Sequence, residues 1–203
     1  LKKINDNPLH IRYIQNPSEE LILEAVKKNG IAIKYINNPS EIVKEIAIKN
    51  NPLAVEYIDQ LSEENAISAV RLLWNSLKYI KNASEAVKIE AVKTKGWAIQ
   101  YIDNPTEEMQ LIAVSKDFDA IRYIKNPTEK VQLEAIKNYW AAIKFIDKPS
   151  LEARRAAVKE NEEAINVALN KYAVLADEEK EFVTNYNELL DKQAEYDKLL
   201  QES

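Results

Sequence analysis

The chain has 203 residues and a formal net charge of −5, with 46% hydrophobic and 30% charged residues, two glycines and no cysteine. This composition is that of a helical protein with a substantial core, and the lack of cysteine excludes disulfide bonds and thiolate metal sites. No apolar run approaches the roughly 20 residues of a membrane span and no signal peptide is visible, so we expect a cytoplasmic protein with no membrane partner.

One aromatic position recurs every 22 residues along most of the chain. The series is Tyr13, Tyr35, Tyr57, Tyr79, Tyr101, Tyr123 and Phe145. A period of this length indicates one supersecondary unit that is copied and stacked, each copy burying the apolar face of its neighbour. We therefore predict an all-α fold, an α/α superhelical solenoid of about seven 22-residue two-helix repeats over residues 1–168.

Other positions keep the same interval. A hydroxyl residue recurs at Ser18, Ser40, Ser62, Ser84, Thr106, Thr128 and Ser150. An alanine followed by valine or isoleucine recurs at Ala25, Ala47, Ala69, Ala91, Ala113, Ala135 and Ala157. Proline precedes the hydroxyl residue in five copies, and Leu61 and Ala83 replace it in the other two. A small residue beside a β-branched one in every copy indicates a repeated packing contact.

The chain opens inside the first helix of a repeat, because Leu1, Ile4 and Pro8 align with Leu23, Val26 and Gly30. Natural arrays usually end in a polar capping element. We expect either that upstream repeats are missing or that a degenerate first helix caps the array.

The copy that begins at Pro17 predicts two short helices. Asn-Pro stops the preceding helix, Ser18 is the N-cap of the next one, and Asn29-Gly30 ends that helix with a left-handed cap. A second helix of about two turns is predicted from Ile31 to Asn37, with Ile33 and Ile36 facing inward. A helix this short is unstable alone, so it must depend on stacking against neighbouring repeats.

Basic residues form a ladder near the end of the first helix of most copies. Its members are Lys27, Lys49, Arg71, Lys93, Lys137 and Lys159. A second basic column contains Arg12, Lys34, Lys78, Arg122 and Lys144. Cations here offset the helix dipole, so solvated ladders and contact with an acidic protein or a nucleic-acid backbone both remain open.

Aromatic residues replace the usual turn residues in later copies. They are Trp74, Trp97, Phe118, Tyr139 and Trp140. Turns are surface features and tryptophan is enriched where partners bind, so these residues are the candidate protein contact. Packing between neighbouring turns would explain the same pattern without a ligand.

The C-terminal segment, residues 169–203, predicts one long amphipathic helix. Its seam is formed by Phe182, Tyr186, Leu189, Gln193, Tyr196 and Leu200. The helix either caps the array or forms a coiled coil with a second chain. From Asn170 to Ser203 nine acidic and four basic residues account for the whole net charge, so residues 1–169 are neutral, whereas a nucleic-acid-binding protein normally has a basic excess.

No catalytic constellation is visible in the sequence. His10 is the single histidine and takes a position that is alanine in most other copies, so we expect it to fill the core. There is no phosphate-binding glycine loop, no nucleophile with a histidine partner and no recurrent metal-ligand spacing. We expect a protein that is not an enzyme and has no cofactor or metal.

The Asn-Pro-Ser/Thr segments, each followed by an Ala-Val or Ala-Ile pair and an Ala-Ile-x-Tyr-Ile helix, resemble the short α/α repeats grouped with HEAT-like proteins. They are most similar to leucine-rich repeat variant units and to uncharacterised repeats of bacterial and phage proteins. The resemblance implies a superhelical binding scaffold. Leucine-rich repeat variant proteins can carry an iron–sulfur cluster on cysteines, which this chain lacks. HEAT-like DNA glycosylases grip DNA in a basic groove, a role that the neutral array disfavours.

Taken together, these patterns predict a non-catalytic scaffold that binds another protein. The alternative is a nucleic-acid-binding rod that uses the basic ladder. A third hypothesis is a phage-encoded inhibitor or assembly factor.

Overall fold

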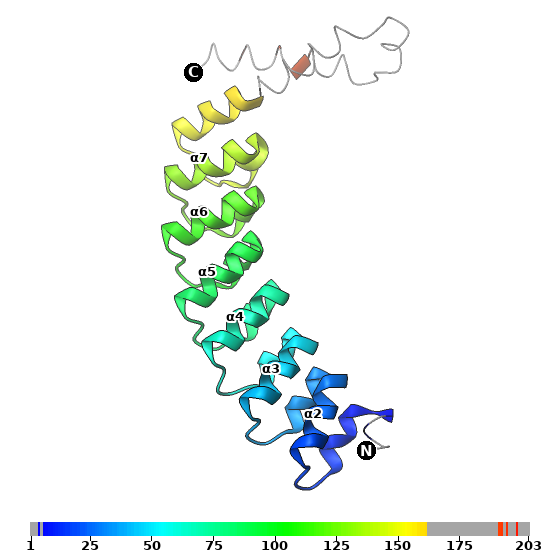
Figure 1. Cartoon of the computed structure of the whole chain (residues 1–203). Coiled ribbons are helices and arrows are strands. Elements are labelled where there is room, and N and C mark those ends of the chain that lie inside the picture. Colours follow the sequence, from blue (N-terminus) through cyan, green and yellow to red (C-terminus); the bar gives the residue numbers. More distant parts are fainter. Residues whose placement is uncertain (1–3, 5, 162–190, 193, 195–197, 199–203) are drawn as a thin grey trace, which may run out of the picture. The chain divides into compact units, whose positions relative to one another are not determined.

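The computed structural model describes residues 4, 6–161, 191–192, 194 and 198. The chain divides into two compact units, unit 1 (Leu1–Lys116) and unit 2 (Asp117–Ser203). None of the described residues lies in a strand, and helices alternate regularly with short loops (Figure 1). The predicted all-α repeat architecture is therefore confirmed.

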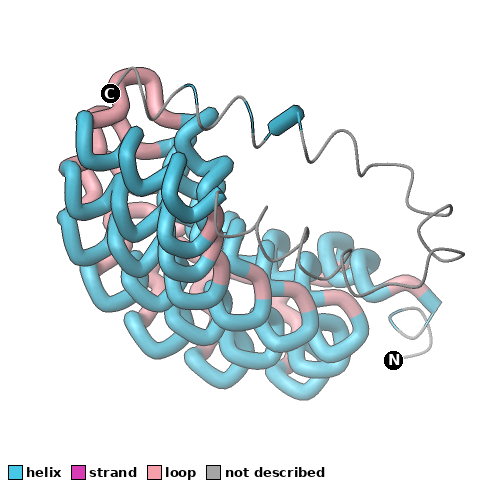
Figure 2. The backbone as a smooth tube through the Cα atoms, turned by 90° about the horizontal axis from the view of Figure 1, so that it is seen from above, coloured by secondary structure: helices cyan, strands magenta, loops and turns pink. Residues whose placement is uncertain are grey.

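Unit 1 alternates ten-residue α-helices with six-residue 3₁₀ helices, labelled η. The α-helices are α2 (Glu19–Lys28), α3 (Glu41–Asn50), α4 (Glu63–Leu72), α5 (Glu85–Thr94) and α6 (Glu107–Lys116). The 3₁₀ helices are η1 (Pro8–Tyr13), η2 (Gly30–Tyr35), η3 (Pro52–Tyr57), η4 (Trp74–Tyr79) and η5 (Gly96–Tyr101). Successive α-helices contact one another, and so do successive 3₁₀ helices. Each unit viewed along the stack shows the same turn of helix and loop repeated (Figure 2).

The hydroxyl column starts each α-helix, as predicted. Ser18 Oγ accepts the backbone N–H of Leu21 at 3.3 Å, and Ser84 Oγ accepts that of Val87 at 3.3 Å. The remaining members make the same bond three residues on, namely Ser40, Ser62, Thr106, Thr128 and Ser150. These bonds satisfy one of the N–H groups that a helix leaves without an internal partner.

The second helix of each repeat is 3₁₀ and not α, and in the copy analysed above it ends at Tyr35, two residues before the predicted Asn37. Its backbone N–H groups bond three residues back, as in Ile36 N to Ile33 O at 3.0 Å. A 3₁₀ helix has three residues per turn, so Ile33 and Ile36 lie on one face, and they are 1% and 9% exposed. Six residues at about 2.0 Å per residue span about 12 Å, against about 15 Å for ten at about 1.5 Å, so 3₁₀ winding brings the six-residue helix closer to the length of the α layer than α winding, at about 9 Å, would.

The predicted left-handed cap at Asn29-Gly30 is wrong. Asn29 is extended, with φ −149° and ψ 106°, and its side chain caps η2 by accepting the N–H of Ile31, the second residue of that helix. Gly30 does not have a positive φ. It is needed for space instead, because a Cβ at Gly30 would lie 2.2 Å from the carbonyl oxygen of Ala47.

Positive φ occurs at the asparagine two residues before the hydroxyl N-cap of an α-helix. Among the described non-glycine residues it is found at Asn16, Asn38, Asn82, Asn104 and Asn126, with φ between 48° and 53°. Asparagine tolerates this region better than most residues. The recurrent Asn therefore forms the corner between a 3₁₀ helix and the next α-helix in these five copies.

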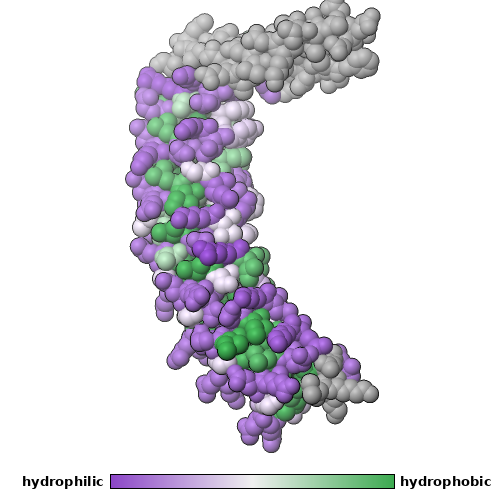
Figure 3. Space-filling model, viewed as in Figure 1, coloured by the Kyte–Doolittle hydropathy of each residue, from purple (hydrophilic) through white to green (hydrophobic). Residues whose placement is uncertain are grey.

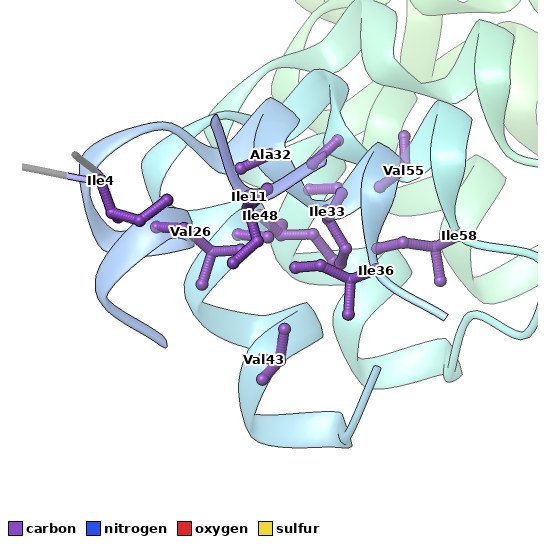
Figure 4. Packing of buried hydrophobic residues seen from close by; sticks show 14 residues of the cluster. Ile4, Ile11, Val26, Ala32, Ile33, Ile36, Val43, Ile48, Val55 and Ile58 are labelled. Carbon is purple, nitrogen blue, oxygen red and sulfur yellow. The ribbon is translucent and has the colours of Figure 1, made fainter. Parts of the chain in front are cut away.

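The core of unit 1 lies between the two layers of helices (Figure 4). The alanines of the repeated pair are fully buried in α2 to α6, as are the valine or isoleucine residues that follow them. Ile11, Ile33 and Val55 of the 3₁₀ helices pack from the other side and are at most 2% exposed. Burying a side chain of this size contributes about 1.5 to 3 kcal/mol, which supplies the stability that the short helices lack alone.

Unit 2 continues the same pattern in its described part. It contains η6 (Phe118–Tyr123), α7 (Glu129–Asn138), η7 (Trp140–Phe145) and a helix over residues 151–161. The predicted boundary between residues 168 and 169 and the seam from Phe182 to Leu200 lie outside the described residues. In the part of the chain that is described, no helix has the length and apolarity needed to cross a membrane.

Candidate interaction surface

Three of the five predicted contact aromatics come together in unit 2. Phe118 begins η6, Tyr139 directly precedes η7 and Trp140 begins it. The Phe118 and Tyr139 ring centroids are 4.8 Å apart, and those of Tyr139 and Trp140 are 5.8 Å apart. Tyr139 is 45% exposed, whereas the other two are half-buried. The three rings therefore pack on one another, and the Tyr139 ring remains partly exposed to solvent.

The other two aromatics, Trp74 and Trp97, lie in unit 1 at the starts of η4 and η5. Trp74 stacks on Tyr101, with ring centroids 6.0 Å apart and an interplanar angle of 22°. The Lys95 ammonium lies 5.2 Å from the centroid of the Trp97 ring. Both tryptophans are half-buried, so they are anchored by neighbouring side chains and present only part of their surface.

The turn over residues 72–76 departs from the repeat at several successive positions. Leu72 is 55% exposed, whereas the equivalent residues of the other copies are polar: Lys28, Asn50, Thr94, Lys116, Asn138 and Glu160. Leu73 replaces the capping asparagine, and η4 has no side-chain cap hydrogen bond. Asn75 Oδ1 and Ser76 Oγ are buried without a hydrogen-bond partner. Local rules tend to fail together at functional sites.

Leu72 also lines a groove between α3 and α4, with a volume of about 850 Å³. Ile42, which is 59% exposed, and Ile67 give the groove further apolar surface. Glu63 and Glu64 at the start of α4 line it as well. In Figure 3 apolar patches interrupt a hydrophilic surface on the face in view. The groove was not visible from sequence, because it depends on how two helices 22 residues apart pack.

A polar network that includes Glu41 and Asn65, two residues of the groove lining, joins α3 to α4. Lys44 is only 8% exposed and donates to Glu41 Oε1 at 2.6 Å and to the Gln60 carbonyl oxygen at 2.7 Å. Asn65 Nδ2 donates to the other Glu41 oxygen at 3.2 Å. The hydrogen bond from Lys44 holds the pKa of the Glu41 carboxyl below its ordinary value. The bond to Gln60 lies where this copy has Gln60-Leu61 in place of Asn-Pro.

All six members of the predicted basic ladder are exposed: Lys27, Lys49, Arg71 and Lys93 in unit 1, and Lys137 and Lys159 in unit 2. Two of the four in unit 1 are paired with carboxylates. Lys49 Nζ lies 2.5 Å from Glu45 Oε1, and Arg71 Nε lies 2.6 Å from Glu90 Oε1. The Arg71 hydrogen bond holds the pKa of the Glu90 carboxyl below its ordinary value. Internal pairing of this kind weakens the ladder as a surface for phosphates.

His10 is half-buried in η1, and its ring centroid lies 6.0 Å from that of Tyr13. It lies at the edge of the core and not in its centre, unlike the fully buried alanines at the equivalent position in other copies, such as Ala32 and Ala54. Among the described residues, no group of three or more His, Cys, Asp or Glu side chains is placed to hold a metal ion.

The comparisons with known proteins agree with the repeat but name no activity. A family model described as "Domain of unknown function (DUF4116)" matches residues 18–61. The match runs from the N-cap Ser18 to the residue before the N-cap Ser62, so the chain resembles this family over two consecutive repeats. The chain matches no curated protein and no solved structure.

Proposed function

We propose that this repeat protein is a non-catalytic scaffold that binds another protein, and that the 72–76 turn with the adjoining α3–α4 groove is its contact in unit 1. The proposal is carried by Leu72, which is 55% exposed in a column that is otherwise polar. Tryptophan, as at Trp74, is enriched among the few interface residues whose truncation costs about 2 kcal/mol or more. The exposed Leu72 adds apolar surface two residues before it.

Stability alone does not account for the side chains of this turn. Burying the Ser76 hydroxyl and the Asn75 oxygen without partners costs about 1 to 3 kcal/mol for each group. Alanine occupies the position of Ser76 in most other copies and has no such cost. The two buried polar groups are thus a further departure of this turn from the regular copies, beside the exposed Leu72.

The aromatic cluster of Phe118, Tyr139 and Trp140 is a second contact of the same kind in unit 2. Tyr139 takes the position of the capping Asn29 and Trp140 that of Gly30. Neither substitution is needed for the local fold, because asparagine and glycine serve there in the second copy. The open edge of Tyr139 is available to a partner.

A test replaces the irregular residues by those of the regular copies. The double variant Leu72→Asn, Trp74→Pro copies Asn50 and Pro52 and should fold with unchanged helical content. Partner capture from source lysate, identified by mass, should fall at least about tenfold for the protein that the wild type retains. The control Lys28→Asn alters the same column in another copy and should capture normally.

Equal capture by the double variant would remove the 72–76 turn as the contact. Salt dependence distinguishes nucleic-acid binding from protein binding. Affinity for a phosphate backbone falls steeply between about 50 and 200 mM salt, whereas the affinity of an apolar protein contact changes little. The basic ladder would be favoured instead if nucleic acid co-purified with the wild type at low salt, was released over this salt range, and did not co-purify with the double variant Lys27→Glu, Lys93→Glu.

A further inference from the structure

The 3₁₀ layer of unit 1 carries a continuous row of tyrosines, which we call the tyrosine face: Tyr13, Tyr35, Tyr57, Tyr79 and Tyr101 with the cations Arg12, Lys34 and Lys78. Each tyrosine is the last residue of a 3₁₀ helix, and the residue before it is exposed in every copy. Successive 3₁₀ helices contact one another. The row therefore presents one ring per repeat.

Although the tyrosines belong to the columns that define the repeat, they are not core residues. Tyr13 is 70% exposed, Tyr35 is 37% exposed and Tyr101 is 36% exposed. Tyr57 and Tyr79 are half-buried. Partial burial raises the pKa of the Tyr57 hydroxyl, and Glu56 raises it further. Smaller contributions come from Tyr79 and Tyr35, the tyrosines of the two neighbouring repeats.

The cations are held against the rings. The Arg12 guanidinium carbon lies 4.5 Å from the centroid of Tyr13, and the ammonium of Lys78 lies 5.3 Å from that of Tyr79. The ammonium of Lys34 crosses to the next repeat and lies 5.1 Å from the centroid of Tyr57. Such contacts fix long flexible side chains before a ligand arrives. A bound anion would then cost less side-chain entropy.

The charge of this column is positive although unit 1 is neutral. In the position before each tyrosine stand Arg12, Lys34, Glu56, Lys78 and Gln100. Three cations and one carboxylate leave a local excess that favours an acidic partner. Nucleic acid fits less well, because Glu56 interrupts the series of cations and unit 1 has no basic excess.

The general spacing of packed helices favours one shape of partner. Packed helices lie roughly 8 to 10 Å apart, and a polyproline II helix advances about 9 Å per turn of three residues. One residue in three of such a peptide would thus face each tyrosine in succession. Aromatic-lined surfaces are the usual receptors for this conformation.

From the exposed rings, the held cations and the matching period, we propose that the tyrosine face of unit 1 binds an extended acidic, proline-rich segment of another protein in the polyproline II conformation. Acidic side chains of the segment lie opposite Arg12, Lys34 and Lys78, and a neutral residue lies opposite Glu56. The tyrosine face lies on the 3₁₀ layer and the Leu72 groove lies between α3 and α4. The two surfaces adjoin where Trp74 stacks on Tyr101, so the variants that distinguish them lie away from that contact, at Lys34, Glu56 and Lys78.

Fluorescence anisotropy with labelled synthetic peptides and the full chain tests this proposal. Five copies of Glu-Pro-Pro should bind at least about fivefold more tightly than five copies of Gln-Pro-Pro, because each exposed ion pair adds a small increment. A Glu-Pro-Pro-Pro repeat has the same acids at a longer period and should bind more weakly. Oligothymidylate of similar length should bind more weakly than Glu-Pro-Pro at the same ionic strength.

Variants at exposed positions of the protein then assign the surface. Lys34→Gln, Lys78→Gln should weaken Glu-Pro-Pro binding about fivefold or more, whereas Glu56→Gln, which copies Gln100, should strengthen it. The matched control Lys27→Gln, Lys93→Gln makes the same charge change among the α-helices and should bind normally. Circular dichroism should be unchanged in every variant.

Three results would overturn the proposal: no peptide binding at millimolar concentration, equal loss in the control variant, or tighter binding of oligothymidylate than of Glu-Pro-Pro. The Lys34→Gln, Lys78→Gln variant should still capture the partner of the 72–76 turn. A joint loss of both activities would mean that the two surfaces are one.

Discussion

At the scale of single residues, Gly30 is fixed by contact with the next repeat. Its N–H donates to Asn50 Oδ1 at 2.6 Å, and Asn50 Nδ2 donates to the Lys27 carbonyl at 2.9 Å. This pair of bonds draws η2 against α3, and the site of a Cβ is already occupied by the Ala47 carbonyl. Sequence reasoning finds the glycine but assigns it a conformational role, because the cross-repeat contact has no local signal.

Gly30→Ala should therefore destabilise unit 1. The added methyl group must separate η2 from α3, and overpacking of this kind usually lowers the free energy of unfolding by about 1 to 3 kcal/mol. Urea unfolding followed by circular dichroism measures the change. Pro52→Ala at the equivalent position adds no atom and serves as the control. If both variants unfold at the wild-type midpoint, the close approach is not a feature of the protein in solution.

At the scale of elements, the sequence predicts where each α-helix begins, but it does not predict that the second helix of each repeat is a 3₁₀ helix. Hydroxyl caps act within three residues, so their column predicts each α-helix start correctly. The 3₁₀ winding lengthens the six-residue helix toward that of the ten-residue helix in the opposite layer, and no residue within Gly30–Tyr35 signals this relation between the layers. Substitution of a helix-capping residue therefore tests the sequence-based prediction more directly than a substitution in the 3₁₀ helix.

Ser84→Ala should lower the free energy of unfolding by about 1 kcal/mol, within a range of about 0.5 to 2 kcal/mol, because the N–H of Val87 loses its acceptor. Ser84→Thr keeps the hydroxyl, as Thr106 and Thr128 do in the same column, and should remain near the wild-type value. Thermal and urea unfolding of the two variants, compared pairwise, measure the difference. Equal destabilisation by threonine would point to packing and not to capping.

At the scale of the whole molecule, the period predicts a linear array, but the candidate surfaces arise between repeats. The α3–α4 groove and the Lys34–Tyr57 contact each join residues of neighbouring copies. A single sequence shows which columns exist but not which side chains meet across them. The predicted aromatics divide in the same way, since Phe118, Tyr139 and Trp140 meet while Trp74 packs on Tyr101.

Linear stacking also predicts how far along the array a destabilising substitution acts. Ile48→Ala removes a fully buried side chain from α3 and should cost about 2 to 5 kcal/mol. Because each repeat contacts only its neighbours, amide hydrogen exchange should accelerate in α2, α3 and α4 and change much less in α6. Ile42→Ala in the same helix alters an exposed side chain and should leave exchange unaltered. Uniform acceleration across unit 1 would instead indicate a single cooperative core.

The left-handed asparagines have a consequence for chemical ageing. Asparagine deamidates when the nitrogen of the following residue attacks its side chain and closes a five-membered imide. Asn16, Asn38, Asn104 and Asn126 each precede a proline, whose tertiary nitrogen cannot complete this ring closure. Asn82 precedes Ala83, whose backbone N–H can take part in the ring closure. Among these five corners, Asn82 is therefore the one where deamidation can occur, and its extent would increase with the age of the molecule.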